Sequence, residues 1–231
     1  MLTTQTEKML CIGHRGAMGH APENTLLSIR KALEMGVDWI EVDVYLVEGE
    51  LVVIHDPELS RTTNGAGAVM EQSLAYLRSL DAGQGEKIPF LPEVFDLVDK
   101  RVGINIELKG PETAVPTLHF IHEQIENGWS YDNILVSSFD HDMLCTVRQL
   151  DANIKIGALI FYEPDELARF AAEMGAYSVN PWLMTMSEPF VQDAHDRGLR
   201  VFVYTVNEPQ DIARMRQWGV DGIFTNYPDR V

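Results

Sequence analysis

The feature of this 231-residue sequence that most constrains its fold is a regular alternation of two kinds of segment. Short apolar runs rich in β-branched residues are each followed by a segment whose apolar residues recur with helical spacing, which indicates βα units and a parallel sheet. Eight such runs occur, at residues 9–14, 39–44, 103–108, 133–137, 154–159, 176–180, 200–205 and 222–225. Eight βα units close a barrel, whereas an open doubly wound sheet usually has fewer strands, so the sequence predicts an α/β fold of the (β/α)₈ TIM barrel type.

The expected helices between these strands have recognisable ends. Asn24 or Thr25 can cap the first helix, because both side chains accept hydrogen bonds from the first turn. Glu163-Pro164 is expected to begin another helix that stops before Gly175. Only a few residues follow the eighth strand, so the last outer helix is expected to be missing or very short.

Two segments depart from the alternation. Residues 45–56 have the pattern of a hairpin with its turn at Glu48-Gly49-Glu50, so the second strand is expected to extend beyond the barrel. Residues 57–89 contain four Gly and the run Thr62-Thr63-Asn64-Gly65, with one short helical stretch at about 72–80. A connection of this length without barrel elements indicates a lid or a small inserted subdomain. We therefore expect a single domain over residues 1–231, with an inserted subdomain at about 57–89.

The net charge restricts the partners of the chain. Eighteen Lys and Arg against 35 Asp and Glu give a formal charge of −17. Nucleic acid is disfavoured, because its binding relies on clustered basic residues, and an anionic lipid surface would be repelled, so no stable membrane association is expected. The charge would also repel a small phosphate-bearing substrate, so a site for such a molecule must contain its own local positive charge.

The amino-terminal residues do not resemble an export signal. Residues 1–8 are polar, and the apolar stretch at 9–12 is much too short for a signal peptide or a membrane helix, so a cytoplasmic location is expected. Cys11 and Cys145 lack the spacing of a disulfide framework or a zinc site and are expected to pack as small apolar residues. The sequence leaves open whether the chain forms a homo-oligomer.

Polar side chains collect where the predicted strands end, which is where (β/α)₈ barrels place their chemistry. Glu41 and Asp43 are two positions apart on one strand, and so are Glu107 and Lys109 on another, so each pair points to one side. If both faces turn inward, three carboxylates meet, and a divalent cation is the simplest remedy for their repulsion. Oxygen ligands favour Mg²⁺ or Ca²⁺ over zinc. The sequence therefore predicts one such cation on Glu41, Asp43 and Glu107.

Each of these pairs also has a simpler interpretation. Glu41 and Asp43 would fit the polar face of a half-exposed strand, and Glu107 with Lys109 would fit a buried ion pair. The first alternative is weakened because residues 40, 42 and 44 are apolar and because strands of a parallel barrel are normally covered on both faces.

Two histidines and two cationic residues complete the predicted site. His14 and His55 are candidates for proton transfer, since imidazole titrates near neutral pH, although a structural histidine is the alternative for either alone. Arg15 offers a planar fork to two phosphate oxygens, and Lys109 offers a point charge. This combination indicates phosphoryl chemistry. The sequence contains neither a Gly-x-Ser-x-Gly motif nor a Walker-type loop.

Short motifs extend over almost the whole chain. They are His14-Arg15-Gly16, Pro22-Glu23-Asn24-Thr25, Glu41-x-Asp43, His55-Asp56, Arg61-Thr62-Thr63-Asn64-Gly65, Glu107-x-Lys109, Ser137-Ser138-Phe139 and Tyr204-Thr205-Val206-Asn207. In this order and spacing they resemble the glycerophosphodiester phosphodiesterase family. The resemblance implies a (β/α)₈ barrel with a small insertion after the second strand. It also implies hydrolysis of small-molecule glycerophosphodiesters to sn-glycerol 3-phosphate and an alcohol.

The resemblance also implies roles for individual residues. The cation would be bound by Glu41, Asp43 and Glu107, with His14 and His55 as general base and acid and with Arg15 and Lys109 on the phosphate. Phe139 is expected to pack against the substrate. Tyr204 stands where many relatives carry Trp, and this departure bears on which alcohol is preferred.

Two other functions predict different sequence features. A phosphoinositide- or sphingomyelin-directed phospholipase on a similar barrel would be expected to have apolar or basic membrane-binding loops, which residues 57–89 lack. A non-catalytic phosphodiester sensor would be expected to have lost a proton-transfer residue or a cation ligand, yet all of them are present.

Overall fold

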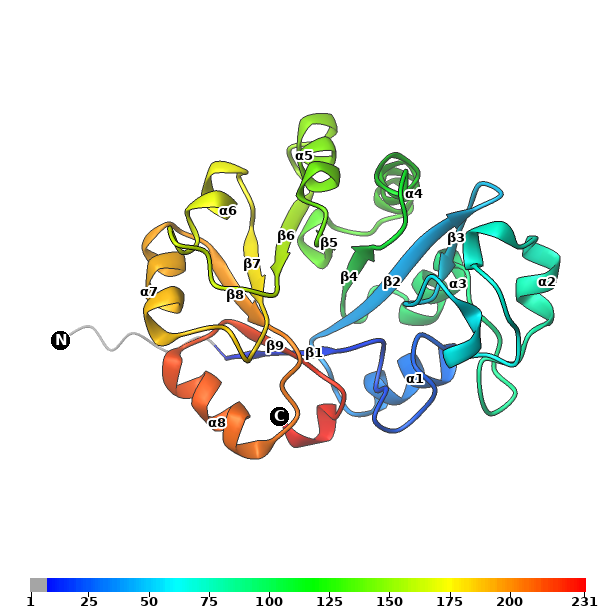
Figure 1. Ribbon diagram of the computed structural model, residues 1–231, viewed down its shortest axis with the longest axis horizontal. Coiled ribbons are helices and arrows are strands. Elements are labelled where there is room, and N and C mark those ends of the chain that lie inside the picture. The colour runs from blue at the N-terminus through cyan, green and yellow to red at the C-terminus, as the bar shows by residue number, and fades with distance from the viewer. Residues whose placement is uncertain (1–7) are drawn as a thin grey trace.

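The computed structural model describes residues 8–231, and within this range eight parallel strands form a closed barrel (Figure 1). These strands are β1 (Leu10–Gly13), β2 (Trp39–Val47), β4 (Gly103–Leu108), β5 (Ile134–Ser138), β6 (Lys155–Ile160), β7 (Ser178–Pro181), β8 (Arg200–Val203) and β9 (Gly222–Thr225). Strand β1 pairs with both β9 and β2, which closes the ring. The predicted (β/α)₈ TIM barrel is confirmed.

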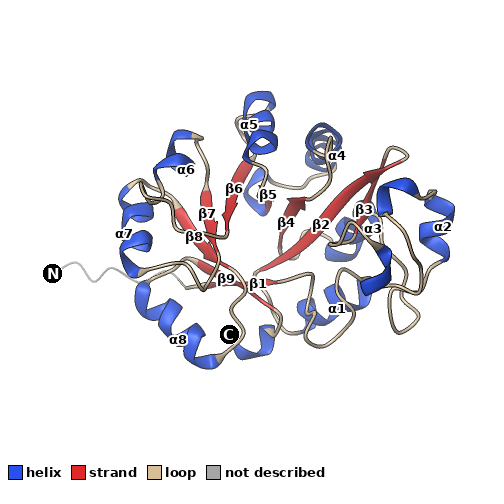
Figure 2. Ribbon diagram, viewed as in Figure 1, coloured by secondary structure: helices blue, strands red, loops and turns tan. Residues whose placement is uncertain are grey.

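Helices surround the barrel on the outside (Figure 2). They are α1 (Leu26–Glu34), α3 (Leu91–Val98), α4 (Ala114–Glu126), α5 (His141–Leu150), α6 (Arg169–Glu173), α7 (Glu188–Asp196) and α8 (Pro209–Trp218). Thr25 caps α1 by accepting a hydrogen bond from the Ser28 amide. After β9 the chain forms only the short 3₁₀ helix η4 (Pro228–Arg230), as the sequence predicts. Among residues 8–231, no helix is long and apolar enough to cross a membrane.

One predicted helix is wrong at its start. The sequence pattern places it from Glu163-Pro164 onward, but α6 spans only Arg169–Glu173. Leu167 has a positive φ of 51°, a conformation that does not continue a right-handed helix. The residues between β6 and α6 therefore form a long loop at the carboxyl end of the barrel.

Successive residues of each strand face in turn the outer helices and the barrel interior. The outward residues of β2, which include Ile40, Val42 and Val44, are fully buried in the main hydrophobic core beneath the helices. A second, small apolar cluster contains residues from opposite sides of the barrel, which can meet only in its interior: Ile12, Leu135, Phe202 and Phe224. This layer fills the barrel, so the polar residues nearer the carboxyl ends of the strands have a closed floor beneath them.

The predicted hairpin is confirmed and leads into a segment at the side of the barrel. Strand β3 (Glu50–Val53) pairs antiparallel with β2. The chain then forms η1 (Leu59–Arg61), η2 (Val69–Glu71) and α2 (Leu74–Ser79), which lie beyond β3 in Figure 1. This segment and the hairpin share a hydrophobic cluster of their own, composed of Tyr45, Val47, Val52, Ile54, Leu59, Val69, Leu77, Leu80, Ala82 and Ile88.

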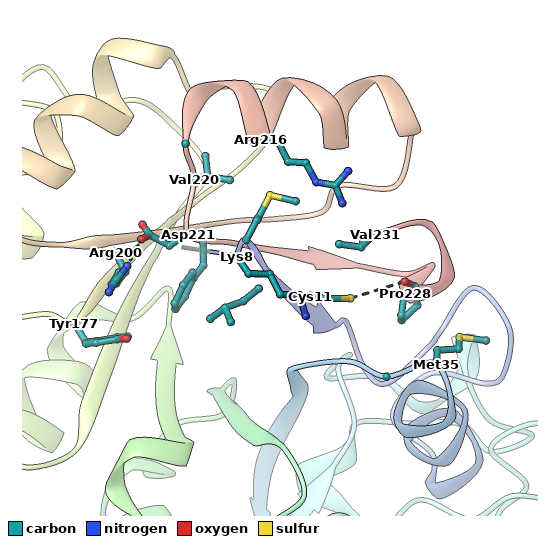
Figure 3. Close-up of a pocket in the computed structure, with 15 residues that line it drawn as sticks. Lys8, Cys11, Met35, Tyr177, Arg200, Arg216, Val220, Asp221, Pro228 and Val231 are labelled. Carbon is teal, nitrogen blue, oxygen red and sulfur yellow. Dashed lines mark hydrogen bonds and ion pairs between the residues drawn. The ribbon is translucent and has the colours of Figure 1, made fainter. Parts of the chain in front are cut away.

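A cavity of about 800 Å³ lies at the amino-terminal end of the barrel strands, where β1, β8 and β9 begin (Figure 3). Arg200 and Asp221 form an ion pair of 2.6 Å there, and Asp221 also accepts a hydrogen bond from the Val201 amide. Cys11 is buried beside this cavity, and burial raises the pKa of its thiol to about 12. Apart from Lys8, the polar amino-terminal stretch singled out in the sequence lies outside the described residues.

Candidate active site

Three carboxylates meet inside the barrel near the carboxyl ends of β2 and β4. Glu41, Asp43 and Glu107 each offer an oxygen, and these oxygens all lie within 4.8 Å of one another. Their side chains are buried, and Asp43 and Glu107 are partners in the register of the two paired strands. The alternative in which Glu41 and Asp43 face solvent is therefore wrong.

Burial and mutual repulsion act on the protonation of this acidic triad. Burial, followed by the charges of Asp43 and Glu107, holds the pKa of Glu41 well above its usual range. Burial and then the charge of Asp43 raise the pKa of Glu107 to about 7. Without a bound cation, Glu41 and Glu107 therefore lose their protons less readily than free carboxyl groups, as expected for like charges in a poorly solvated site.

Two oxygens of the triad show that it fits a cation. Among residues 8–231, Oε1 of Glu41 and Oδ1 of Asp43 are buried without a hydrogen-bond partner. A buried carboxylate oxygen without a partner is costly, and a hard divalent cation with a preference for oxygen ligands would satisfy both atoms. The triad is thus able to hold a metal ion.

The turn after β1 carries Arg15 to these carboxylates. The Arg15 amide donates a hydrogen bond to Oε2 of Glu41 (2.8 Å), and its Nε lies 3.4 Å from Oδ2 of Asp43. Arg15 has a φ of 51°, which is uncommon for this residue type and indicates that the surrounding contacts hold the turn. The next residue must be glycine, because a Cβ on Gly16 would lie 2.6 Å from the backbone of Ser28.

His14 lies at the end of β1 with one ring nitrogen held and the other available. Its Nδ1 is 2.7 Å from the side-chain oxygen of Asn226, which can only accept, so Nδ1 carries the hydrogen and Nε2 is left with a lone pair. Burial and then the positive charge of Arg15 lower the pKa of His14 to about 4. The ring is therefore neutral at pH 7 and able to take up a proton.

His55 follows β3 and is held from both sides. Its Nδ1 lies 2.6 Å from Oδ1 of Asp56, and its Nε2 lies 3.2 Å from Nζ of Lys109. Burial lowers the pKa of His55, although the negative charge of Asp43 and the hydrogen bond with Asp56 act to raise it. The carboxylate at Nδ1 fixes the ring and would stabilise its protonated form.

Lys109 joins the cationic part of the site to the acidic triad. Its Nζ donates to Oε1 of Glu107 (2.8 Å) and lies 3.9 Å from Oδ1 of Asp43. Burial alone would lower the pKa of Lys109, but these two carboxylates raise it, so the ammonium group stays charged. The buried ion pair considered as an alternative for Glu107 and Lys109 is present, and both residues also line the cavity of the site.

A cavity of about 260 Å³ opens over the triad, with a polar and an apolar side. The polar side is lined by His14, Arg15, Glu41, His55, Asn105, Glu107 and Lys109. The apolar side is lined mainly by Phe139, Leu159, Trp182, Tyr204 and Phe224. The ring of Tyr204 meets that of Phe139 edge to face at 5.8 Å, while its hydroxyl donates to the Ile160 carbonyl. All nine residues singled out from the sequence are thus brought together around one cavity or the triad beneath it.

Comparison with known proteins identifies the family. The profile of the glycerophosphoryl diester phosphodiesterase family matches residues 14–230. The chain belongs to this family. The resemblance and the enzyme class predicted from the sequence are therefore confirmed.

Individual members of the glycerophosphoryl diester phosphodiesterase family match nearly the full chain. A glycerophosphodiester phosphodiesterase of Caldanaerobacter subterraneus subsp. tengcongensis is 38% identical over 96% of each chain. One from Bacillus subtilis is 33% identical over 96% of this chain and 85% of its own length. Among solved structures, an Oleispira antarctica phosphodiesterase in complex with the product sn-glycerol-3-phosphate has a TM-score of 0.88 and 31% identity, over 96% of this chain and 94% of that one.

Three residues of this family member have site contacts to which the sequence assigned no role. Arg61, in η1, donates to both carboxylate oxygens of Glu23 (2.8 and 2.7 Å) and contacts the carboxylate of Asp56 through Nε and Nη2. Glu23 in turn accepts from Nη1 of Arg15. Arg61 therefore links the carboxylate behind His55 to the carboxylate behind Arg15.

The third of these residues, Asn24, holds the acidic triad directly. Its Nδ2 donates to Oδ2 of Asp43 (2.8 Å), and its own φ is positive at 56°. Glu23, Asn24 and Arg61 are all present in the sequence motifs, but the motifs alone do not say which side chains they hold. Their polar character within loops near the strand ends was the available signal.

Proposed function

We propose that this chain hydrolyses glycerophosphodiesters to sn-glycerol 3-phosphate and an alcohol, with one divalent cation, Mg²⁺ or Ca²⁺, on Glu41, Asp43 and Glu107. The observation that carries the proposal is the buried triad, in which two oxygens lack a hydrogen bond, beneath a cavity that is also lined by two histidines and two cationic side chains. The family relatives and the product complex of the Oleispira antarctica phosphodiesterase support it.

Arg15 and Lys109 bind the phosphate in this proposal. They bring positive charge into a chain of net charge −17, and both already contact the triad. The guanidinium group can donate hydrogen bonds to two phosphate oxygens, and the ammonium group can stabilise the negative charge that develops on a third. When bound, the cation would add Lewis-acid stabilisation of the phosphate oxygens.

His14 and His55 transfer the protons. Nε2 of neutral His14 takes a proton from the attacking hydroxyl group, which belongs either to water or to the glycerol itself. His55, supported by Asp56 at Nδ1, gives a proton to the departing oxygen. In the complete reaction the oxygen of water joins phosphorus, the bond from phosphorus to the alcohol oxygen breaks, and the alcohol leaves with a proton.

Phe139 and Tyr204 form the apolar wall against which we propose that the substrate packs. Phe139 is partly exposed in the mouth of the cavity, so its ring is accessible to a bound molecule. We also propose that residues 1–231 form one domain and that residues 57–89 form an inserted subdomain. The hydrophobic cluster that this segment shares with the hairpin supports the division.

The test is the release of glycerol 3-phosphate from glycerophosphocholine in a coupled assay. We expect release by the untreated protein, loss on adding a chelator, and recovery on adding back Mg²⁺ or Ca²⁺. Intact phospholipid vesicles are the matched second substrate, and efficient hydrolysis of vesicles alone would favour the phospholipase alternative. Release that a chelator leaves unchanged would remove the cation from the proposal.

A further inference from the structure

The cavity of about 800 Å³ at the amino-terminal end of the strands takes no part in the reaction proposed above. Its volume lies within the range of roughly 300 to 1,000 Å³ that is usual for small-molecule sites. No residue that lines it also lines the active-site cavity. The apolar layer of the barrel interior separates the two, because Phe202 lines one cavity and Phe224 the other.

The floor of this amino-terminal cavity is apolar. Leu10, Tyr177 and Phe202 line it, and all three belong to the cluster inside the barrel or pack against it. Elsewhere at the same end of the barrel an aromatic side chain fills the space, since a Cβ on Gly103 would lie 2.2 Å from the Trp39 ring. The cavity therefore leaves part of the barrel core uncovered, and an apolar molecule would gain free energy by covering it.

The charged side chains around this cavity are mostly cationic, although the chain has a net charge of −17. Lys8, Arg200 and Arg216 line it, together with one acidic side chain, Asp221. Figure 3 shows Arg200 beside Asp221 on one side of the cavity and Arg216, on α8, apart from them. A local excess of positive charge in an acidic protein favours a negatively charged ligand.

Arg216 is the cation in this cavity that lacks a carboxylate partner. Lys8 pairs with Asp38 and Arg200 pairs with Asp221, so these two cations each have an acidic neighbour. By contrast, the side chain of Arg216 forms no hydrogen bond or ion pair with any part of the chain that the structure describes. Its guanidinium group can donate two parallel hydrogen bonds to a bound anion.

We propose that this cavity is a second ligand site, which binds a small monocarboxylate with an apolar body. The carboxylate group contacts Arg216, and the apolar body lies against Leu10, Tyr177 and Phe202. Both parts are needed. A simple inorganic anion would leave the apolar floor in contact with water, and a neutral hydrocarbon would leave Arg216 without a partner.

The number of available cations favours a carboxylate over a phosphate monoester. One guanidinium group balances a single negative charge, which is the charge of a carboxylate. A phosphate monoester carries a charge near −2 at pH 7 and would need a second cation. In this cavity Lys8 and Arg200 already balance aspartates, and Asp221 would repel the additional charge.

The experiment measures binding of octanoate, octanamide and acetate to the full chain by calorimetry, with a chelator present. We expect octanoate to bind at one molecule per chain. Octanamide has nearly the same shape without the charge and should bind about tenfold or more weaker, the effect of losing hydrogen bonds to a charged group. Acetate keeps the charge but lacks most of the apolar body and should bind about a hundredfold or more weaker.

Three variants locate the bound carboxylate. Arg216→Gln should weaken octanoate binding by about tenfold or more and leave octanamide binding and the hydrolysis of glycerophosphocholine unchanged. Arg214→Gln is the matched control on the same helix, because Arg214 pairs with Asp211 and does not line the cavity. Lys109→Ala removes a cation of the active-site cavity and should leave octanoate binding unchanged.

Several results would overturn the proposal. They are the absence of saturable binding at millimolar octanoate, equal affinities for octanoate and octanamide, and octanoate binding that Arg216→Gln leaves unchanged. Loss of octanoate binding in Lys109→Ala would place the carboxylate in the active-site cavity and would also overturn it. Because binding is measured without added cation or phosphodiester, the outcome does not depend on the function proposed above.

Discussion

At the amino-terminal end of the barrel, Asp38 and Asp221 each stand directly before a strand and accept a hydrogen bond from the backbone of a neighbouring strand. Asp38 accepts from the Cys11 amide and Asp221 from the Val201 amide, both at 2.8 Å. Both aspartates also pair with cations, Lys8 and Arg200. At the carboxyl end, the acidic triad is more deeply buried, yet two of its oxygens accept no hydrogen bond from residues 8–231.

The contrast separates two uses of the same chemical group. A carboxylate whose oxygens are occupied by backbone amides and cations connects strands and stabilises the fold. A carboxylate that is buried, crowded by like charges and short of partners destabilises the fold by itself and is suited to bind something. This division between the two ends of the barrel predicts four effects of decreasing size.

The largest effect is expected at the proton-transfer residues of the carboxyl end. His14→Ala or His55→Ala should lower kcat/KM for glycerophosphocholine by ~10² to 10⁴-fold, the range for loss of one general acid or base. The melting temperature should change little by comparison. Kinetics and thermal unfolding of the same preparations measure both quantities, and near wild-type turnover in either variant would remove that histidine from the mechanism.

A smaller loss of activity is expected at Arg61, which positions other residues and does not itself line the cavity. Arg61→Ala releases Glu23 and Asp56, and therefore the settings of Arg15 and His55, so kcat/KM should fall by roughly tenfold to a hundredfold. Arg61→Lys keeps the charge without the fork and should recover only part of the loss. Turnover unchanged in Arg61→Ala would show that the inserted segment does not support the site.

The opposite pattern is expected at the amino-terminal end. Asp221→Ala leaves the Val201 amide and Arg200 without this acceptor and should lower the free energy of unfolding by about 1 to 3 kcal/mol. Activity per folded molecule should stay at the wild-type level. Asp132→Ala, which removes an exposed partner of Lys155, is the control and should cost at most about 0.5 kcal/mol. Denaturant unfolding measures both variants, and an inactive but stable Asp221→Ala would contradict the division.

The smallest effect is a pH dependence of the stabilisation by the cation. The pKa of Glu107 is raised from 4.5 to about 7 in the cation-free fold. The protonated form of Glu107 therefore favours folding. Its stabilising contribution is complete below pH 4.5 and is lost as the pH rises through about 7. A cation needs the carboxylate form, so the gain in melting temperature from Mg²⁺ or Ca²⁺ should grow between about pH 5 and pH 8. Glu107→Gln should flatten this trend, whereas an equal gain at both pH values would argue against binding at the triad.

Much of the fold could be predicted because strands buried on both faces have nearly continuous apolar runs that stand out in the sequence. The inward convergence of Glu41, Asp43 and Glu107 follows from the two-residue period of strands and from closure of the barrel. The helix expected after Glu163-Pro164 failed because Leu167 takes a positive φ, which no periodicity reveals.

The contacts behind the site could not be predicted because loops set them. Arg15 and Asn24 both have a positive φ, and Arg61 reaches Glu23 from 38 positions away. The exposure of the aromatic side chains after β6 could not be predicted for the same reason. Phe161 and Tyr162 follow an apolar strand and look like its continuation in the sequence, whereas the structure leaves them exposed on a loop.

The most direct measurement is a titration of cation-free protein with Mn²⁺, an ion that oxygen ligands also accept, in which bound ion and glycerol 3-phosphate release are followed in the same samples. We expect the rate to rise in proportion to the bound ion and to level off at one ion per chain, and we expect Glu41→Gln to weaken both in parallel. Full activity in samples without bound ion, or binding that Glu41→Gln leaves unchanged, would contradict the assignment of the triad.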